Sequence, residues 1–292
     1  MIELIKIFQG HNNYVVDVKF SPDSTKLLSS GMDAKINIWD TDSWKLLTTL
    51  EDHKNSVNSL SLSYNGEILA SGSTDKTVKI WNLNNKNLLR TLSGHKKTVS
   101  TIQISPDLNY LVSGSYDGKI KLWNIKSGLE IFSISAFEQN VSSVAFSQDG
   151  TLLSAAGLSE SIYFWEIPSG KLIKEIPGHD KVVSSILFSP DSNFFVSCDY
   201  SCLIVRSSED FKQLQKTKLD VGYSHFSAIS PDSQTLALTS DHQIQLFNLV
   251  NTELIESINL KPKGIYGIAF SPNGKLLAMG SADKNIRIWS VS

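Results

Sequence analysis

The sequence is poor in cysteine and arginine, and it contains no long uninterrupted hydrophobic run. Its two cysteines, Cys198 and Cys202, are too few for a disulfide framework, so a reducing compartment, by default the cytoplasm, is expected. The N-terminal stretch MIELIKIFQGH carries Glu3 and Lys6 within its apolar run. It is too short and too charged for a signal peptide or a membrane span, so no membrane association is expected.

An excess of charge of one sign is also missing. The formal net charge is -2 at pH 7, from 27 basic and 29 acidic residues, so no bulk attraction to nucleic acid or to an anionic membrane is expected. Only three of the basic residues are arginines: Arg90, Arg206 and Arg287. Because readers of phosphorylated peptides use arginine clusters for bidentate contacts, recognition of phosphate groups is not expected either.

What the sequence does contain is repetition. The stretch GHKKTVSTIQISPDLNYLVSGSYDGKIKLWN, residues 94–124, carries His95, Asp117 and Trp123 at successive intervals of 22 and 6 residues. Shifted by 42 residues in either direction, this pattern falls on a copy of itself. The tryptophan position recurs at steps of 42, 42, 42, 42, 40 and 42 residues, at Trp39, Trp81, Trp123, Trp165, Ser207, Phe247 and Trp289. Seven repeats are therefore predicted to fill residues 1–292 as a single domain.

Each repeat predicts four short β-strands and no helix. Apolar runs of four to seven residues have the period of strands and are bounded by turn residues. In the second repeat these runs cover residues 57–62, 67–72, 77–81 and 87–92. The first run has an apolar step of three in place of two, as in Val57, Leu60 and Leu62, which indicates a β-bulge. A Ser-Pro-Asp turn follows this run in four of the repeats.

The arrangement of the sheets follows from the ends of the chain. One four-stranded sheet of this size cannot bury both faces, so the copies must stack on one another. Only six fourth strands lie between the repeats, at residues 45–50, 87–92, 129–134, 171–176, 212–219 and 253–259. The sequence stops at Ser292, directly after the third strand of repeat seven. Residues 2–8 align with the fourth strands and are predicted to complete the last sheet, which closes the stack into a ring.

On these residues the chain resembles the WD-repeat family over its whole length. Gly-His pairs at 10–11, 94–95 and 178–179 and the Trp-Asp pair at 39–40 match the family signature. The resemblance implies an all-β fold, a seven-bladed β-propeller of four-stranded antiparallel blades closed by the N-terminal strand. It also implies a buried hydrogen-bonded set of His, Ser or Thr, Asp and Trp in each blade. The complete sets are His11, Ser29, Asp33, Trp39; His53, Ser71, Asp75, Trp81; and His95, Ser113, Asp117, Trp123.

These sets combine the residue types of hydrolase triads. Their repetition at one spacing argues for a structural role, because an enzyme needs one site and not three. The later repeats lose members of the set. Phe137 and Ser159 replace His and Asp in repeat four; repeat five keeps His179 with Ser201 and Ser207; repeat six has Asp220, Asp241 and Phe247; repeat seven has Lys261, Asp283 and Trp289. Blades after about residue 136 are therefore predicted to be less regular and locally less stable.

The two cysteines flank a turn, Asp199-Tyr-Ser, in repeat five. Their spacing fits neither a usual zinc motif nor a redox C-x-x-C motif, and no histidine is in phase with them. They are interpreted as ordinary buried thiols. No metal site, no cofactor and no catalytic residue is predicted.

The family resemblance also implies where a partner binds. In WD-repeat propellers the positions three and five after the His, and the one before the Asp, point onto the narrow rim around the central channel. Five of the eight tyrosines occupy these positions, which also include Thr98 and Ser100. Tyrosine is a good anchor for partners because it joins a rigid apolar body to a polar tip. The predicted partner-binding residues are Tyr14, Met32, Asn58, Tyr116, Asn140, Leu158, Tyr200, Tyr223, His225 and Tyr266.

The predicted function is a non-enzymatic protein-interaction scaffold, a monomeric propeller within a larger complex that binds a peptide or protein on this rim. The alternative is an enzyme at the channel mouth, which would need a compact cluster of His, Asp or Glu, whereas only His225 is predicted there. A third possibility is a propeller that binds nucleic acid, for which a basic face would be needed. The lysine-rich turns near Lys54, Lys96 and Lys263 are interpreted as solvated loops.

Overall fold

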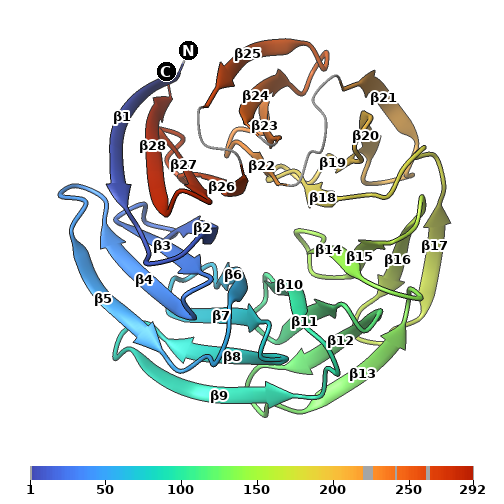
Figure 1. Ribbon diagram of the computed structural model, residues 1–292. Coiled ribbons are helices and arrows are strands. Elements are labelled where there is room, and N and C mark those ends of the chain that lie inside the picture. Colours follow the sequence, from blue (N-terminus) through green and yellow to red (C-terminus); the bar gives the residue numbers. More distant parts are fainter. Residues whose placement is uncertain (1, 220–225, 241, 261–263, 292) are drawn as a thin grey trace. The chain divides into compact units, whose positions relative to one another are not determined.

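The structure is a computed structural model that describes residues 2–219, 226–240, 242–260 and 264–291 (Figure 1). The described residues form seven four-stranded antiparallel sheets; six are built from four strands consecutive in sequence, and the seventh joins the last three strands to the first. The predicted all-β, seven-bladed propeller is therefore confirmed. Within the described ranges no helix is long and apolar enough to cross a membrane. The chain forms two compact units, residues 1–58 with 221–292, and residues 59–220, which are described in turn.

The first unit contains blades one, six and seven. Their strands are β2 (Val15–Phe20), β3 (Lys26–Gly31), β4 (Lys35–Asp40) and β5 (Leu46–Glu51); β22 (Ser227–Ile229), β23 (Thr235–Thr239), β24 (Gln243–Asn248) and β25 (Leu254–Asn259); and β26 (Ile265–Phe270), β27 (Leu276–Ser281), β28 (Asn285–Val291) and β1 (Ile2–Gln9). Strand β1 runs antiparallel beside β28, with Ile2 opposite Val291 and Gln9 opposite Asn285. The N-terminal strand thus completes blade seven, as predicted, and both marked chain ends lie there (Figure 1).

The second unit contains blades two to five, although the first two residues of β6 belong to the first unit. The strands are β6 (Val57–Leu62), β7 (Ile68–Ser73), β8 (Thr77–Asn82) and β9 (Asn87–Ser93); β10 (Val99–Ile104), β11 (Tyr110–Ser115), β12 (Lys119–Asn124) and β13 (Glu130–Ser135); β14 (Val141–Phe146), β15 (Leu152–Gly157), β16 (Ile162–Glu166) and β17 (Leu172–Ile176); and β18 (Ser185–Phe188), β19 (Phe194–Cys198), β20 (Cys202–Ser207) and β21 (Gln213–Lys218). The fourth strand of each blade lies where the sequence predicts it.

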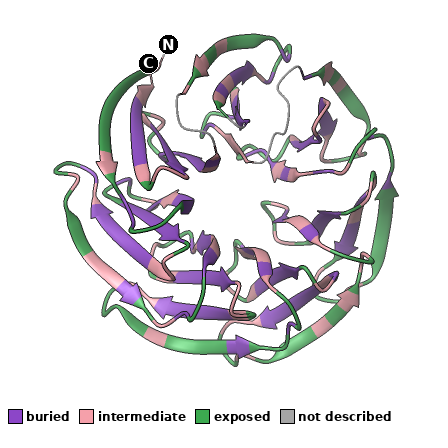
Figure 2. Ribbon diagram, in the orientation of Figure 1, coloured by how far each residue is buried: buried purple, intermediate pink, exposed green. Residues whose placement is uncertain are grey.

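Burial follows the order of strands within each blade (Figure 2). The second and third strands are almost wholly buried, as in β11 and β12, whereas the fourth strand, as in β13, alternates between exposed and half-buried residues. A strand covered on both faces needs small or apolar side chains throughout. Gly114 in β11 shows how tight the packing is, because a Cβ atom there would lie 2.6 Å from a methyl group of Val141.

The hydrophobic core lies between neighbouring sheets and not within one of them. In the first unit Val18 and Leu27 of blade one pack in one cluster with Ile288 of blade seven. In the second unit Leu122 of blade three packs in one cluster with Val144 of blade four. Each sheet therefore depends on its neighbours for burial, as in other repeat proteins.

The predicted bulge in the first strand is present in blades one, three, four and seven. The pairing register shifts between Val15 and Asp17, Val99 and Thr101, Val141 and Ser143, and Tyr266 and Ile268. In blades five and six the first strands are shorter, with four residues in β18 and three in β22, and their paired residues run without such a shift. This shortening agrees with the lower regularity predicted for the later blades.

Candidate functional site

The polar set of blade three joins four segments of the blade. His95 lies in the loop between β9 and β10, Ser113 on β11, Asp117 in the turn before β12, and Trp123 on β12. The imidazole of His95 lies 3.2 Å through Nδ1 from Asp117 Oδ2 and 2.8 Å through Nε2 from Ser113 Oγ. The indole of Trp123 donates to the same hydroxyl over 2.8 Å. The set therefore ties the loop and two strands together.

Blade one repeats this geometry. His11 Nδ1 lies 2.9 Å from Asp33 Oδ1, and His11 Nε2 lies 2.8 Å from Ser29 Oγ. Trp39 donates to Ser29 over 2.9 Å. In blade two the Trp81 indole donates to Ser71 over 2.9 Å. His53 is buried in the loop between β5 and β6, and Asp75 lies in the turn before β8. The structure thus brings together the predicted members in blades one and three, and the Ser–Trp pair in blade two.

The electrostatics of the set favour a neutral imidazole next to a carboxylate. Burial lowers the pKa of His95, although the Asp117 carboxylate partly opposes this effect. Burial alone would raise the pKa of Asp117, but hydrogen bonds from the Lys96 amide and from His95 lower it overall. A buried, fully bonded network of this kind restrains the fold, since each member satisfies another where water is excluded.

Blade five departs from the sequence prediction in two places. His179 Nδ1 lies 3.1 Å from Asp199 Oδ2, and its Nε2 lies 2.8 Å from Ser197 Oγ. The assignment of Ser201 to the aspartate position is therefore wrong, because Asp199 fills that role. The tryptophan position is also misassigned: Arg206 pairs with Phe195 as Trp123 pairs with Leu111, so Arg206, not Ser207, occupies it.

The physical reason is a tighter hairpin. Trp123 stands ten positions after Ser113, but Arg206 stands only nine positions after Ser197. The turn closes with the Asp199 amide donating to the Cys202 carbonyl over 3.0 Å. The buried Arg206 guanidinium donates to Ser197 Oγ over 3.3 Å, in place of an indole. Fixed spacing from the earlier repeats therefore fails at this blade.

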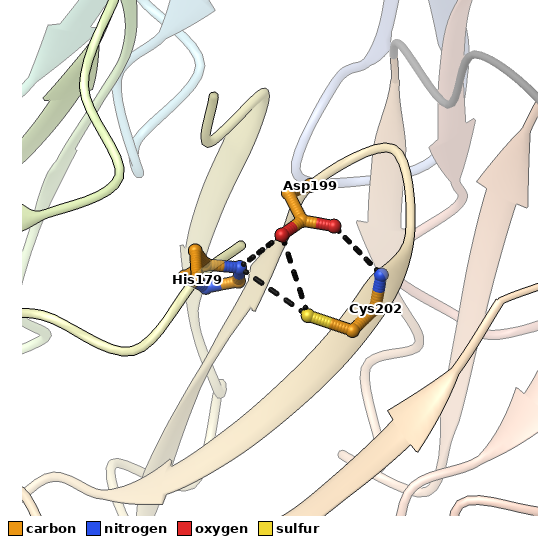
Figure 3. Close-up of side chains that lie close together, drawn as sticks. All are labelled: His179, Asp199 and Cys202. Atoms are coloured by element: carbon orange, nitrogen blue, oxygen red, sulfur yellow. Dashed lines mark hydrogen bonds and ion pairs between the residues drawn. The ribbon is translucent and has the colours of Figure 1, made fainter. Parts of the chain in front are cut away.

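The tighter hairpin also brings Cys202 into the set (Figure 3). Its Sγ lies 3.4 Å from Asp199 Oδ2 and 3.6 Å from His179 Nδ1. The expectation that no histidine accompanies the cysteines is therefore wrong. Cys198 is fully buried on the neighbouring strand β19, and both thiols are free.

A cysteine, a histidine and an aspartate are also the residue types found at catalytic sites with a thiol nucleophile. An activated thiol needs a lowered pKa and access to substrate. Here burial, followed by the nearby Asp199 carboxylate, raises the pKa of Cys202 to about 12, and the side chain is buried. Hydrogen bonds to the Asp199 carboxylate, chiefly from Ser201 and Cys202, overcome the effect of burial and lower its pKa to about 2. The cluster holds a protonated thiol beside a carboxylate and lacks the features of a nucleophile.

The predicted rim residues fall into exposed and half-buried groups. Four side chains are exposed enough to meet a partner: Tyr14 (38%), Met32 (40%), Tyr116 (48%) and Leu158 (56%). Asn58, Asn140, Tyr200 and Tyr266 are half-buried. Tyr223 and His225 lie outside the described residues, as do Lys261, Asp220 and Asp241.

Two of the rim positions are adjacent in blades one, three, four and seven. The residue before the Asp position donates its amide to the carbonyl of the residue three after the His position. Met32 bonds Tyr14 in this way over 2.9 Å, and Leu158 bonds Asn140 over 3.0 Å. Tyr116 bonds Thr98 over 2.9 Å. These side chains therefore come in neighbouring pairs.

The first unit adds an aromatic cluster to one such pair. The rings of Tyr14 and Tyr266 stack, with centroids 6.1 Å apart and planes inclined by 18°. The ring of Phe226 meets Tyr266 edge-on at 6.2 Å. The sequence prediction did not include Phe226, because it counted positions from the histidine and Phe226 stands one residue after the nearest of them. Its aromatic character next to a rim position was the only available signal.

Comparison with protein families agrees with the repeat pattern. The family model of the WD domain, G-beta repeat, matches residues 2–40, 44–82, 86–124, 128–166, 170–205 and 254–290, which together make up more than half of the chain. The chain belongs to the WD40-repeat family. WD40 propellers are typically protein-interaction scaffolds and are usually non-catalytic. The fifth matched segment ends directly before Arg206, and residues 206–253 lie outside the matched segments.

One curated relative is similar over a short stretch. Over 48 residues this WD40 chain is 40% identical to pre-mRNA-processing factor 17 of Saccharomyces cerevisiae. The aligned part makes up 16% of this chain and 10% of that protein. The similarity thus extends over little more than one WD40 repeat.

At the predicted rim position five residues after the histidine, serine hydroxyls of this WD40 protein donate to backbone carbonyls. Ser100 donates its hydroxyl to the carbonyl of Val141 over 2.6 Å, and Ser142 donates to the carbonyl of Val183 over 2.6 Å. Each bond joins the first strand of one blade to the next blade along the chain. The serine five residues after the histidine position therefore links neighbouring blades at Ser100 and Ser142, whereas Ser184 bonds the carbonyl of Cys198 in its own blade.

Proposed function

We propose that this WD40 protein is an interaction scaffold that binds a peptide or protein partner through its rim tyrosines, with Tyr14 and Tyr266 as the central contacts. The observation that carries the proposal is the stacked Tyr14–Tyr266 pair, next to which lies the exposed residue Met32, whose amide donates to the Tyr14 carbonyl. Interface cores are enriched in Tyr and Met and depleted of charged residues. A pre-stacked aromatic pair also loses little conformational entropy when a partner binds.

The other rim pairs support the same reading. In the second unit Tyr116 and Leu158 each present a large exposed side chain. Leu158 lies beside Asn140, whose carbonyl accepts from the Leu158 amide over 3.0 Å. Apolar anchors with isolated polar groups suit an extended peptide or a protein loop better than a phosphorylated one, for which arginine clusters are typical.

The test compares capture by three variants of the full chain. Tyr14→Ala with Tyr266→Ala removes the stacked pair, and Tyr116→Ala with Tyr200→Ala removes the predicted tyrosines of the second unit. Tyr64→Ala is the matched control, because Tyr64 is 87% exposed but lies in a turn outside the rim positions. Affinity capture followed by quantitative mass spectrometry measures which partners each variant retains.

We expect the first double variant to lose at least about tenfold in capture of the specific partners, the effect of removing hot-spot residues. The Tyr64→Ala variant should retain all of them. Equal capture by wild type and both double variants, with circular dichroism showing intact folds, would refute the rim as the binding surface.

The proposal includes the cellular setting predicted from the sequence. Both cysteines are free, which supports a reducing compartment such as the cytoplasm, and we propose that the protein acts as a monomer within a larger complex. No partner is carried over from pre-mRNA-processing factor 17, because an alignment of 48 residues supports the repeat pattern and not a binding surface.

A further inference from the structure

Blade five holds three potential metal ligands of different chemical types in one triangle. His179 Nδ1, Asp199 Oδ2 and Cys202 Sγ all lie within 4.8 Å of one another. The separations are 3.1 Å for nitrogen to oxygen, 3.4 Å for sulfur to oxygen and 3.6 Å for sulfur to nitrogen. The three side chains converge from the loop before β18, the β19–β20 turn and the start of β20 (Figure 3).

We propose that His179, Asp199 and Cys202 bind one divalent transition-metal ion, for which zinc is the best match. Zinc takes nitrogen, oxygen and thiolate ligands at about 2.0–2.3 Å in a tetrahedron, so its ligand atoms lie roughly 3.2–3.8 Å apart. The three observed separations are close to the edges of one face of such a tetrahedron. The fourth position would be filled by water or by a ligand from solution, since three protein ligands are supplied.

Hydrogen bonds from neighbouring groups hold the His179 and Asp199 side chains in place. His179 Nε2 lies 2.8 Å from Ser197 Oγ, and donation to this hydroxyl leaves Nδ1 with the lone pair that a metal requires. The other oxygen of Asp199 accepts from the amides of Ser201 and Cys202 over 2.5 and 2.7 Å. These bonds fix the orientation of the imidazole and of the carboxylate, which is what second-shell groups do in metal sites.

Asp199 Oδ2 is also surrounded by more donors than it can satisfy. His179 Nδ1 and Cys202 Sγ approach it, and so do the amides of Asp180 at 3.2 Å and Lys181 at 3.3 Å. A carboxylate oxygen has two lone pairs. When a metal replaces the imidazole and thiol protons, Oδ2 contacts three groups in place of four, namely the metal and the amides of Asp180 and Lys181.

The triangle depends on a residue that is particular to blade five. Cys202 occupies the first position of the third strand, where blade one has Lys35 and blade three has Lys119. In all three blades the amide at this position donates to the set's aspartate. Only in blade five of these three is the side chain a soft metal ligand, so His–Asp pairs elsewhere serve as internal controls.

Metal binding at this site balances in charge and in protons. Cys202 releases its thiol proton to solvent and becomes a thiolate, and the His179 proton moves from Nδ1 to Nε2. One thiolate and one carboxylate neutralise a divalent cation, which matters where all three side chains are at least nine-tenths buried. The metal would fasten the loop before the short strand β18 to the β19–β20 hairpin, which is a structural role.

The experiment titrates the full-length, chelator-treated protein with Co²⁺ and then displaces it with Zn²⁺. Thiolate ligation gives Co²⁺ a near-ultraviolet charge-transfer band, and tetrahedral geometry gives it intense visible bands. We expect saturation at one ion per chain, displacement by zinc, and a higher melting temperature of the wild type with zinc. Absence of the charge-transfer band in the wild type would overturn the proposal.

Two cysteine variants identify the thiol that produces the charge-transfer band. Because the chain has only two cysteines, a band that persists in Cys198→Ser must come from Cys202. Cys202→Ser should lose the band and bind zinc at least about 100-fold more weakly, more than the loss typical of a second-shell change. If Cys198→Ser abolishes the band and Cys202→Ser keeps it, the assignment is wrong. If Cys202→Ser does not fold, the Cys198→Ser titration still decides the question.

Discussion

In blade three the Trp123 indole donates to Ser113, whereas in blade five the Arg206 guanidinium donates to Ser197. Both side chains are at most 3% exposed. An indole brings one donor and a large apolar surface, but a guanidinium brings a charge and five donors that must be accommodated away from water. Burial lowers the pKa of Arg206, which reflects this desolvation.

The aspartates differ in a parallel way. Asp117 keeps 6% of its side chain exposed and accepts from His95 and from the amides of Lys96 and Lys119. Asp199 has no exposure and accepts from four further groups: the amide and the hydroxyl of Ser201, the amide of Lys181 and the thiol of Cys202. The comparison teaches that a blade can lose its tryptophan when its carboxylate becomes the centre of a denser polar network.

The largest expected effect is on that carboxylate. Asp199→Ala should lower the free energy of unfolding by about 3–5 kcal/mol, because it leaves several buried donors unpaired around a group that carries charge. Asp117→Ala should cost less, about 1–3 kcal/mol, since its network is smaller and closer to solvent. Urea denaturation of both variants measures the difference, and equal losses would show that the two networks are equivalent.

The next test removes the imidazole of blade three. His95→Ala should lower stability by about 1–3 kcal/mol, because Asp117 and Ser113 each lose a buried partner. Lys97→Ala, which changes an exposed side chain in the same loop, is the control and should leave the melting temperature unchanged. An unaltered melting temperature for His95→Ala would contradict a structural role for the set.

Hydrogen exchange compares the first strands of the same two blades. Strand β10 has six residues and β18 has four, so fewer ladder bonds must break to open β18. We expect the amides of β18 to exchange at least about tenfold faster than those of β10, in keeping with the lower stability of short elements. Uniform protection across both strands would oppose the predicted weakening of the later blades.

The pH dependence of stability tests both networks at once. Burial lowers the pKa of His95 and of His179, so the unfolded chain takes up protons first as the pH falls below about 6.5, and stability declines. The lowered pKa values of Asp117 and Asp199 add a second decline below about pH 4, which extends to about 2 for Asp199. His95→Gln should flatten the first decline in urea denaturation series at successive pH values. Stability that rises between pH 7 and pH 5 would refute these directions.

Much of the fold could be predicted because its signals are periodic. Steps of 42 residues locate the strands, the bulge appears as an irregular apolar step, and residues 2–8 have the pattern of a fourth strand. The sets of blades one and three were predictable for the same reason, since His95 and Asp117 keep the spacing of His11 and Asp33.

Blade five could not be predicted by spacing because its hairpin is shorter. Counting along the chain selects Ser201 and Ser207, but pairing across the sheet places Asp199 and Arg206 at those positions. The hydrogen-bond ladder fixes which side chains meet, and the shorter hairpin displaces the assignments within this blade. The same limit applies to Phe226, whose contact with Tyr266 joins two blades.

The pairing of β1 with β28 has a consequence for how the chain is made. Strand β1 is synthesised before the other strands of the propeller, yet its partner, Asn285–Val291, is synthesised after them. Residues 59–220, by contrast, form a unit that is continuous in sequence. On a ribosome this continuous unit can pack while β1 still lacks its partner, so blade seven is expected to assemble only after β28 has been synthesised, at the slower rates typical of distant strand pairing.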